Sequence, residues 1–441
     1  MDGRRAAGLS ALGFFLGVVP QESAETLLTI PQQDVLRSWN DEPSAAVSAD
    51  GRWVAFASYA KLAPGDLDDR GDIYVLDRVS GRVTLESVTT GGRRIGVDCS
   101  RPAISRDGRY LVFDGAIARD GQPPAVAVVL RDRWEDVNTV LAGFGTAGDD
   151  NEWTADAAIS GDGRVVVFES TLRNLVTGRD ENSVGRDIYS VDVASGVVRR
   201  VSVDSGGRQS EAGASFTPAV NADGRYVAFT STAELETVPG SVASGSAVSR
   251  RPLSQVYVRD TRLNVTRRVS VCPGGAIPNG RSWHPAISGD GRYVAFVSDA
   301  TNLVPGDRNG SADVFLFDTI TGSTVLVSRN TKGNAANGVS TLPAISADGT
   351  AVAFQSDASD LVCARQCAAT VEDINLLPDV FLFDRATAIV TRISGDRTGG
   401  WMAPSVAPAL DAGGRVVTFT SRHPTDASDN RNDFDLFVRV R

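Results

Sequence analysis

Short acidic loops recur along this chain of 441 residues, and their side-chain oxygens could bind a metal ion. In each loop two carboxylate or amide side chains stand two residues apart, and a further aspartate follows six or seven residues after the first. The sets are Asp66, Asp68 and Asp72; Asp180, Asn182 and Asp187; and Asp307, Asn309 and Asp313. Calcium prefers such oxygen ligands, so the spacing predicts calcium sites, and no other cofactor is suggested. The alternative is that Asp and Asn only form the turn and cap the next strand.

Catalytic groups are scarce in the sequence. The only histidines are His284 and His423, so a metal centre with several histidine ligands is excluded, and a Ser-His-Asp triad would need one of these two. The G-x-S-x-G elbow of serine hydrolases does not occur. Carboxylates are abundant, and a pair of them could flank a sugar bond as acid and base. A hydrolase or lyase therefore stays an alternative, with no catalytic residue assigned.

Charge and the N-terminal residues indicate the class of partner and the compartment. A net charge of −10 argues against a nucleic-acid partner, because phosphate binding needs a basic surface. Arg4 and Arg5 precede an apolar run over residues 6–19, which is too short to span a bilayer but typical of a secretory signal. The alternative is a buried N-terminal segment. We expect residues 1–24 to be a signal peptide or an N-terminal extension of an extracytoplasmic protein, periplasmic or secreted, that is not integral to the membrane. Cys363 and Cys367 would suit a small disulfide ring there.

A repeat of about 60 residues organises the rest of the chain. Its signature is a turn of the type S-x-D-G-R followed by an apolar strand, as in SGDGRYVAF. The copies are centred on Asp50, Asp107, Asp162, Asp223, Asp290, Asp348 and, in a degenerate copy, Gly413. Each copy predicts four short antiparallel strands, with an Asp-Gly turn between the first two and a Ser-Gly or Thr-Gly turn between the last two.

Units of four strands at a fixed spacing predict the blades of an all-β propeller, because one blade cannot bury both its faces until neighbours pack around a ring. We expect seven blades in a single domain over residues 25–441; six is the alternative if the second unit, which contains GQPPAVAVVLRD, is not a full blade. The seventh unit ends after its third strand, and a strand-like segment at residues 25–30 precedes the first unit. We expect this N-terminal strand to complete the last blade and close the ring.

The repeat resembles a known family. The pattern S-x-D-G-R-x-h-A-F followed by D-h-h-h-h-D, where h is apolar, is similar to the TolB-type, WD-like propeller repeat of bacterial extracytoplasmic proteins, which also forms the propeller of prolyl-oligopeptidase relatives. The resemblance covers about residues 40–441 and implies the fold, whereas one fold serves many functions. TolB has an additional α/β domain for which we expect no room here, so its role in the Tol system is not carried over.

The strand order predicts which face of the propeller is functional. In an up-and-down blade the loops after the second and fourth strands share one face, and function concentrates on long loops. Large side chains in the loops that enter the first strands are expected at the mouth of the central channel: Trp39, Arg101, Trp153, Phe216, Trp283 and His284. Aromatic and arginine side chains are typical binding anchors, so we expect these residues to bind a ligand or partner. Alternatively, they plug the channel or pack between blades.

These features favour an exported, non-catalytic propeller that binds a protein or a cell-surface polymer through its long-loop face. The alternative is a propeller hydrolase or lyase that acts on a polysaccharide or peptide with carboxylates at the channel mouth. A binding protein should show a shallow face lined by aromatic and arginine side chains, whereas an enzyme should show a deep polar pocket with close carboxylates.

Overall fold

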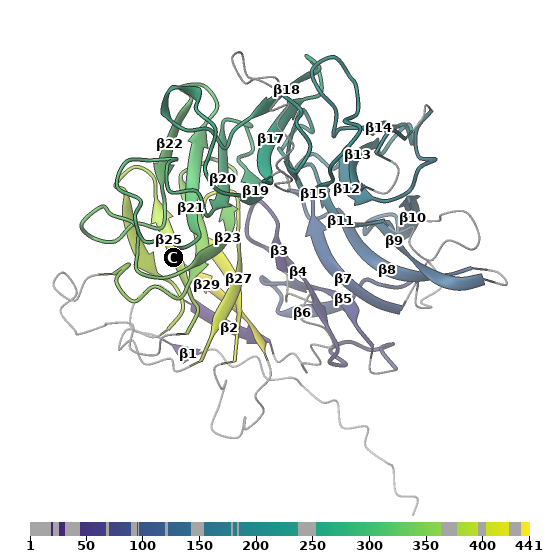
Figure 1. Ribbon diagram of the computed structural model, residues 1–441. Coiled ribbons are helices and arrows are strands. Elements are labelled where there is room, and N and C mark those ends of the chain that lie inside the picture. Colours follow the sequence, from purple (N-terminus) through teal and green to yellow (C-terminus); the bar gives the residue numbers. More distant parts are fainter. Residues whose placement is uncertain are drawn as a thin grey trace, which may run out of the picture.

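Seven antiparallel sheets surround a central axis in the computed structural model (Figure 1). The structure describes residues 19–20, 26–30, 45–67, 70–89, 95, 97–119, 122–142, 154–177, 180–182, 185–236, 253–362, 377–395, 403–422 and 434–441. The prediction of a seven-bladed β-propeller is confirmed, and the six-bladed alternative is wrong.

Each blade is an up-and-down meander that begins at the channel. Blades 1 and 2 contain β3 (Ala45–Val47), β4 (Trp53–Ser58), β5 (Asp72–Asp77), β6 (Arg82–Leu85), β7 (Val97–Ile104), β8 (Tyr110–Arg119), β9 (Gln122–Asp132) and β10 (Val137–Ala142). Blades 3 and 4 contain β11 (Thr154–Ile159), β12 (Val165–Ser170), β13 (Asp187–Asp192), β14 (Val198–Arg200), β15 (Ser215–Val220), β16 (Tyr226–Ser231), β17 (Gln255–Asp260) and β18 (Val265–Arg268). Blades 5 and 6 contain β19 (Ser282–Ile287), β20 (Tyr293–Ser298), β21 (Asp313–Asp318), β22 (Ser323–Leu326), β23 (Ser340–Ile345), β24 (Ala351–Ser356), β25 (Asp379–Asp384) and β26 (Ile389–Arg392).

The N-terminal strand closes the ring, as predicted. Blade 7 contains β27 (Ser405–Leu410), β28 (Val416–Ser421) and β29 (Asp435–Val440), and β2 (Thr26–Ile30) pairs antiparallel with β29 as its fourth strand. A two-residue strand, β1 (Val19–Pro20), pairs with β2 at the edge of this sheet. The innermost strands contact one another around the whole ring, including β27 with β3. Closure therefore joins the two ends of the described chain in one blade.

The divergent second unit forms a full blade. Pairing between β8 and β9 runs from Tyr110↔Asp132 to Arg119↔Gln122. These strands have 10 and 11 residues, so the segment GQPPAVAVVLRD extends the hairpin where other units have an acidic loop. Within β9 the apolar residues 127–130 are buried, as most third-strand residues of the other blades are.

Hydrogen bonds in the short turns explain the repeated motif. In blade 5 the Ser288 hydroxyl donates to Asp290 (2.6 Å) and accepts the N–H of Tyr293 (2.9 Å). Arg292 pairs with Asp318, the last residue of the third strand (2.8 Å), and this arginine lowers the pKa of Asp318 to about 2. The same arginine–aspartate pair recurs as Arg52–Asp77, Arg109–Asp132 and Arg225–Asp260. The arginine after the Asp-Gly turn and the aspartate that ends the third strand thus link the second strand to the third.

Apolar cores lie between neighbouring blades. One cluster joins Tyr293 and Leu316 of blade 5 to Val352 and Phe354 of blade 6. Within six blades an aromatic side chain of the second strand stacks on one of the third, as Phe296 does on Phe315 with 5.9 Å between ring centroids. Each blade therefore buries both faces only in the ring.

Backbone hydrogen bonds link all the blades at the face that carries the short turns, here called the short-turn face. They run from Ala49 N to Arg106 O, Arg106 N to Gly161 O, Asp162 N to Ala222 O, Ala222 N to Gly289 O, Gly289 N to Ala347 O, Asp348 N to Ala412 O and Ala412 N to Ala49 O, at 2.8–3.3 Å. A cavity of about 140 Å³ at this level is lined by Val47, Ile104, Val220, Ile287, Ile345 and Leu410 among others. The channel at this end is lined by apolar side chains and also by polar ones, among them Arg106, Asn221 and Asp411.

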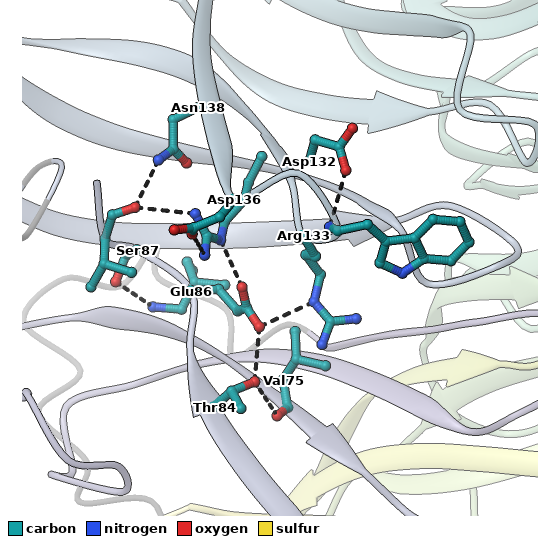
Figure 2. Close-up of polar contacts among 12 residues, drawn as sticks. Val75, Thr84, Glu86, Ser87, Asp132, Arg133, Asp136 and Asn138 are labelled. Atoms are coloured by element: carbon teal, nitrogen blue, oxygen red, sulfur yellow. Dashed lines mark hydrogen bonds and ion pairs between the residues drawn. The ribbon is translucent and has the colours of Figure 1, made fainter. Parts of the chain in front are cut away.

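A buried ion pair ties blade 2 to blade 1 (Figure 2). Both oxygens of Glu86 accept hydrogen bonds from arginines of the next blade, Arg131 Nε at 2.7 Å and Arg133 Nε at 3.1 Å. Asn138 Nδ2 donates to the carbonyl of Val88 at 2.7 Å. Because every charge in this contact is paired, its role in the described structure is to hold two blades together.

Candidate binding site at the channel mouth

A strand bulge shapes the channel at the opposite face, which carries the loops after the second and fourth strands and is here called the long-loop face. In blades 2–7 two residues of the innermost strand lie opposite one phenylalanine of the second strand. The first of the two has a positive φ of 48–54° in every case: Arg101, Asp156, Thr217, His284, Leu342 and Ala407. Such angles are costly for residues other than glycine, and bulges redirect side chains. Blades 2–5 present polar side chains here, and blades 6 and 7 present apolar ones.

Side chains of the second strand hold these bulges in place across the blade boundaries. Asp114 Oδ2 in blade 2 accepts the N–H of Asp156 in blade 3 (2.9 Å). Glu169 Oε2 in blade 3 accepts the N–H of Thr217 in blade 4 (3.1 Å). The same position in blade 6 is Gln355, whose Oε1 accepts the N–H of Ala407 in blade 7 (3.2 Å). The bulges of blades 3, 4 and 7 are therefore each held by a side chain of the preceding blade.

Two arginines complete the polar half of the mouth. Arg101 Nη1 lies 3.0 Å from Asp156 Oδ1 and 3.8 Å from Asp114 Oδ2. Arg186, which precedes β13, pairs with Glu169 (3.0 Å), and its guanidinium lies 5.2 Å from the ring of Phe216. The Arg101 and Arg186 side chains are 39% and 42% exposed, whereas the carboxylates of Asp114 and Glu169 are buried. The accessible groups of this cluster are thus mainly its arginines.

The charge of Asp156 affects the pKa values of groups in three blades at the mouth. Burial, with the nearby charge of Asp156, raises the pKa of Asp114 to about 8 and that of Glu169 to about 7. Burial lowers the pKa of His284, and the charge of Asp156 opposes this shift from two blades away. His284 Nδ1 is buried and makes no hydrogen bond to any described residue. Asp156 therefore acts on groups in blades 2, 3 and 5.

The structure brings part of the predicted set together. Arg101 and His284 lie at the bulges of the mouth, and Phe216 stacks under Arg186 beside them. Trp283 packs against the core between blades 5 and 6, with the guanidinium of Arg281 5.5 Å from its ring. Trp39, Trp153, His423, Cys363 and Cys367 lie outside the described residues.

Four residues of the mouth were not predicted: Asp114, Asp156, Glu169 and Arg186. A signal for two of them exists in the sequence, because a carboxylate follows the phenylalanine of an otherwise apolar second strand in FDG and FES. Charged residues at such buried positions are rare unless they are paired. The other two depend on contacts between blades.

The acidic loops lie on the long-loop face, one set to a blade. The last aspartate of each set accepts a hydrogen bond from a serine that follows the fourth strand, as in Asp72–Ser87 (2.6 Å), Asp187–Ser202 (2.7 Å) and Asp313–Ser328 (2.6 Å). The Tyr74 hydroxyl donates to Asp66, and Asp68 lies outside the described residues. Within the described chain no three His, Cys, Asp or Glu side chains group closely enough to hold a metal ion by themselves.

A hollow of about 520 Å³ lies elsewhere, between blades 4 and 5 beside the short turns. It is lined by Val265, Arg267, Phe317 and Ile320 among others, and its Arg225 is already paired with Asp260 (2.6 Å). None of the predicted site residues lines it, and none of the perturbed carboxylates of the mouth does so. The candidate site is therefore the mouth and not this larger hollow.

Comparison with known proteins supports the fold. No family model and no curated protein matches the sequence. The β-propeller domain of the Trilobed protease from Pyrococcus furiosus matches with a TM-score of 0.53 at 10% identity, over 91% of this chain and 94% of that chain. An oligogalacturonate lyase in complex with manganese matches with a TM-score of 0.51 at 13% identity, over 97% and 96%. The chain is a β-propeller.

A match to TolB from Acinetobacter baumannii is weaker. It has a TM-score of 0.37 at 17% identity and covers 68% of this chain and 58% of that chain. The TolB-type assignment is therefore not confirmed beyond the propeller fold. At these identities the solved structures carry the architecture alone.

Proposed function

We propose that the protein is an exported, non-catalytic β-propeller that binds a protein or a cell-surface polymer through its long-loop face. The observation that carries the proposal is a pair of guanidinium–aromatic contacts on that face, Arg186 over Phe216 and Arg281 over Trp283. Carboxylates hold both arginines, Glu169 at 3.0 Å and Asp299 at 2.9 Å. Arginine and aromatic anchors that are already fixed lose little entropy when a partner binds.

Burial of the perturbed carboxylates favours binding over catalysis. Asp114 Oδ2 and both oxygens of Glu169 accept from backbone N–H groups of the next blade or pair with arginines, and both carboxylates are buried, so they have little access to a substrate. For export, the support is the pair Arg4 and Arg5 before the apolar run of residues 6–19. None of the described segments is a helix long and apolar enough to cross a bilayer.

Cosedimentation with cell envelopes of the source organism tests this function. We expect Phe216→Ala and Arg281→Ala each to weaken binding about tenfold, because truncation of an anchor removes most of its contact area. The matched control is Trp134→Ala, since Trp134 is exposed and stacks with Arg109 (5.1 Å) at a turn of the short-turn face. Equal binding by all three variants and the wild type would remove the long-loop face from the proposal. Protease treatment of the envelopes then separates a protein partner from a polymer.

A hydrolase or lyase acting on a polysaccharide or peptide is the second candidate. It is favoured by the raised pKa of Glu169, about 7, beside Asp156, and by the Nδ1 of His284, which has no hydrogen-bond partner among the described residues. Groups with pKa values shifted toward neutrality are typical of acid–base catalysis. Turnover of a polysaccharide or peptide panel that is lost in His284→Ala and kept in Trp134→Ala would favour this candidate over simple binding.

A further inference from the structure

Equivalent acidic loops in different blades allow a comparison within one chain. In blade 3 the carboxylates of Asp180 and Asp187 each contact two side chains, those of Arg200 and Gln209. The Arg200 guanidinium lies 3.8 Å from Asp180 and 3.6 Å from Asp187. The Gln209 amide donates to both, at 2.7 Å each. This loop therefore holds a fixed cation between its carboxylates. In blade 6 the arginine at the equivalent strand position, Arg392, lies 2.5 Å from Asp379.

Blade 5 has two carboxylates in the equivalent loop but lacks the arginine and glutamine that contact them in blade 3. Asp307 and Asp313 stand at the positions of Asp180 and Asp187. Strand pairing sets Leu326 against Phe315 as it sets Arg200 against Tyr189, so leucine replaces the arginine and phenylalanine the tyrosine. The turns Asn330–Asn334 and Asp204–Arg208 also correspond, which puts Ala335 at the position of Gln209. Three apolar side chains thus take the places of three polar ones.

The two carboxylates of blade 5 are nevertheless buried. Asp307 is 5% exposed, and its Oδ1 makes no hydrogen bond to any described residue. Asp313 is completely buried, and burial raises its pKa to about 7, with further contributions from the charges of Asp307 and Asp360. The two carboxylates both contact Asn309, whose Nδ2 donates to Asp313 Oδ2 (2.7 Å) and whose backbone N–H donates to Asp307. A buried oxygen without a hydrogen-bond partner lowers the stability of the folded protein, so a cation bound beside these carboxylates would stabilise it.

We propose that the blade 5 loop binds one calcium ion through the carboxylates of Asp307 and Asp313 and the amide oxygen of Asn309. The Asn309 amide already lies beside the site, since its Nδ2 donates to Asp313 Oδ2 (2.7 Å) and to the Ala336 carbonyl (2.8 Å). A half-turn of this amide would present its oxygen to the ion in exchange for its present hydrogen bonds, which include the one that Oδ1 accepts from the Ser311 N–H (2.9 Å). Loop carbonyls and water supply the remaining ligands.

The donor set selects the class of metal. All three side chains offer hard oxygen ligands, and the loop from Val304 to Asp313 contains no histidine or cysteine for a softer ion. Calcium tolerates irregular sets of carboxylate, amide, backbone and water oxygens, whereas magnesium demands near-octahedral geometry. The ion would do for blade 5 what the guanidinium of Arg200 does for blade 3. None of these residues belongs to the channel mouth, so a negative test of this calcium site would leave the proposed function unaffected, and the reverse is also true.

Titration calorimetry with calcium chloride on the full chain tests the site. We expect Asp307→Asn to lose one bound calcium per chain relative to the wild type, because it removes a charged ligand and leaves a side chain of equal size. The matched control is Asp180→Asn, which changes the arginine-filled loop of blade 3 and should leave the number of bound ions unchanged. Equal stoichiometry in Asp307→Asn and the wild type, or no binding by the wild type at about 5 mM calcium, which exceeds the dissociation constants of roughly 0.1–1 mM of weak extracellular calcium modules, would overturn the proposal.

A second variant keeps both carboxylates and removes the need for the ion. Leu326→Arg places in blade 5 the guanidinium that blades 3 and 6 already have. An ion that binds only the folded state raises its stability, so EGTA should lower the melting temperature of the wild type. We expect EGTA to have no effect through this site in Leu326→Arg. An equal fall in the wild type and in Leu326→Arg would contradict the assignment to blade 5.

Discussion

Glu169 and Thr217 form a link between blades 3 and 4: the buried carboxylate accepts the backbone N–H of the strained bulge at 3.1 Å. Its other oxygen pairs with Arg186 at 3.0 Å. Asp114 and Asp156 repeat this link one blade earlier. A buried acceptor therefore stabilises a backbone conformation that few side chains tolerate, and the same contact holds an arginine at the channel mouth.

Stability should fall as the pH rises from 5 to 8. Burial raises the folded-state pKa of Glu169 from 4.5 to about 7 and that of Asp114 from 3.8 to about 8. In this window the folded state binds more protons than the unfolded state, so the free energy of unfolding decreases as the pH rises, on the order of a few kcal/mol. Urea denaturation at several pH values in EGTA measures the effect. Glu169→Gln and Asp114→Asn should each flatten the decrease, and a wild-type midpoint that rises over this range would contradict the explanation.

The sequence predicted the blades because the repeated motif is local and has a physical basis. Ser288, Asp290 and Arg292 form the turn of blade 5, and its Asp318 lies in the next strand but one. The mouth depends on contacts between different repeats, which a repeat pattern does not contain. Asp114 meets the N–H of Asp156 only because blades 2 and 3 stand side by side. Large exposed residues such as Arg101 could be found from their positions, whereas their buried supports could not.

Gly289→Ala should destabilise the protein by about 1–3 kcal/mol, as overpacking does. A Cβ at Gly289 would lie 2.9 Å from the carbonyl oxygen of Ala347, within the ring of backbone hydrogen bonds at the short-turn face. Gly413→Ala is the control, because the nearest atom to its new Cβ is the Arg415 side chain at 3.9 Å. Urea denaturation of both variants checks this difference. Equal stability of the two would mean that the ring yields without cost.

Loss of β2 should open the ring. A chain that starts at residue 31 lacks the strand that pairs with β29, whereas one that starts at residue 25 keeps it and, of the described strands, lacks β1 alone. We expect the first truncation to lower the melting temperature by several degrees and to promote aggregation, because β29 becomes an unpaired edge. Calorimetry and light scattering compare the two chains. If they behave alike, closure by the N-terminal strand contributes little to stability.

Blade 3 can be converted into a copy of blade 5. The double variant Arg200→Leu/Gln209→Ala removes the two side chains that serve Asp180 and Asp187 and installs the residue types found at Leu326 and Ala335. Without calcium we expect a loss of about 3–5 kcal/mol, as when one partner of a buried pair is removed. Calcium should restore part of this loss, since the unneutralised carboxylates then resemble the proposed site. Urea denaturation with and without EGTA provides the measurement. A loss that calcium does not reduce would show that two carboxylates in this loop are insufficient for an ion, and would weaken the assignment in blade 5 as well.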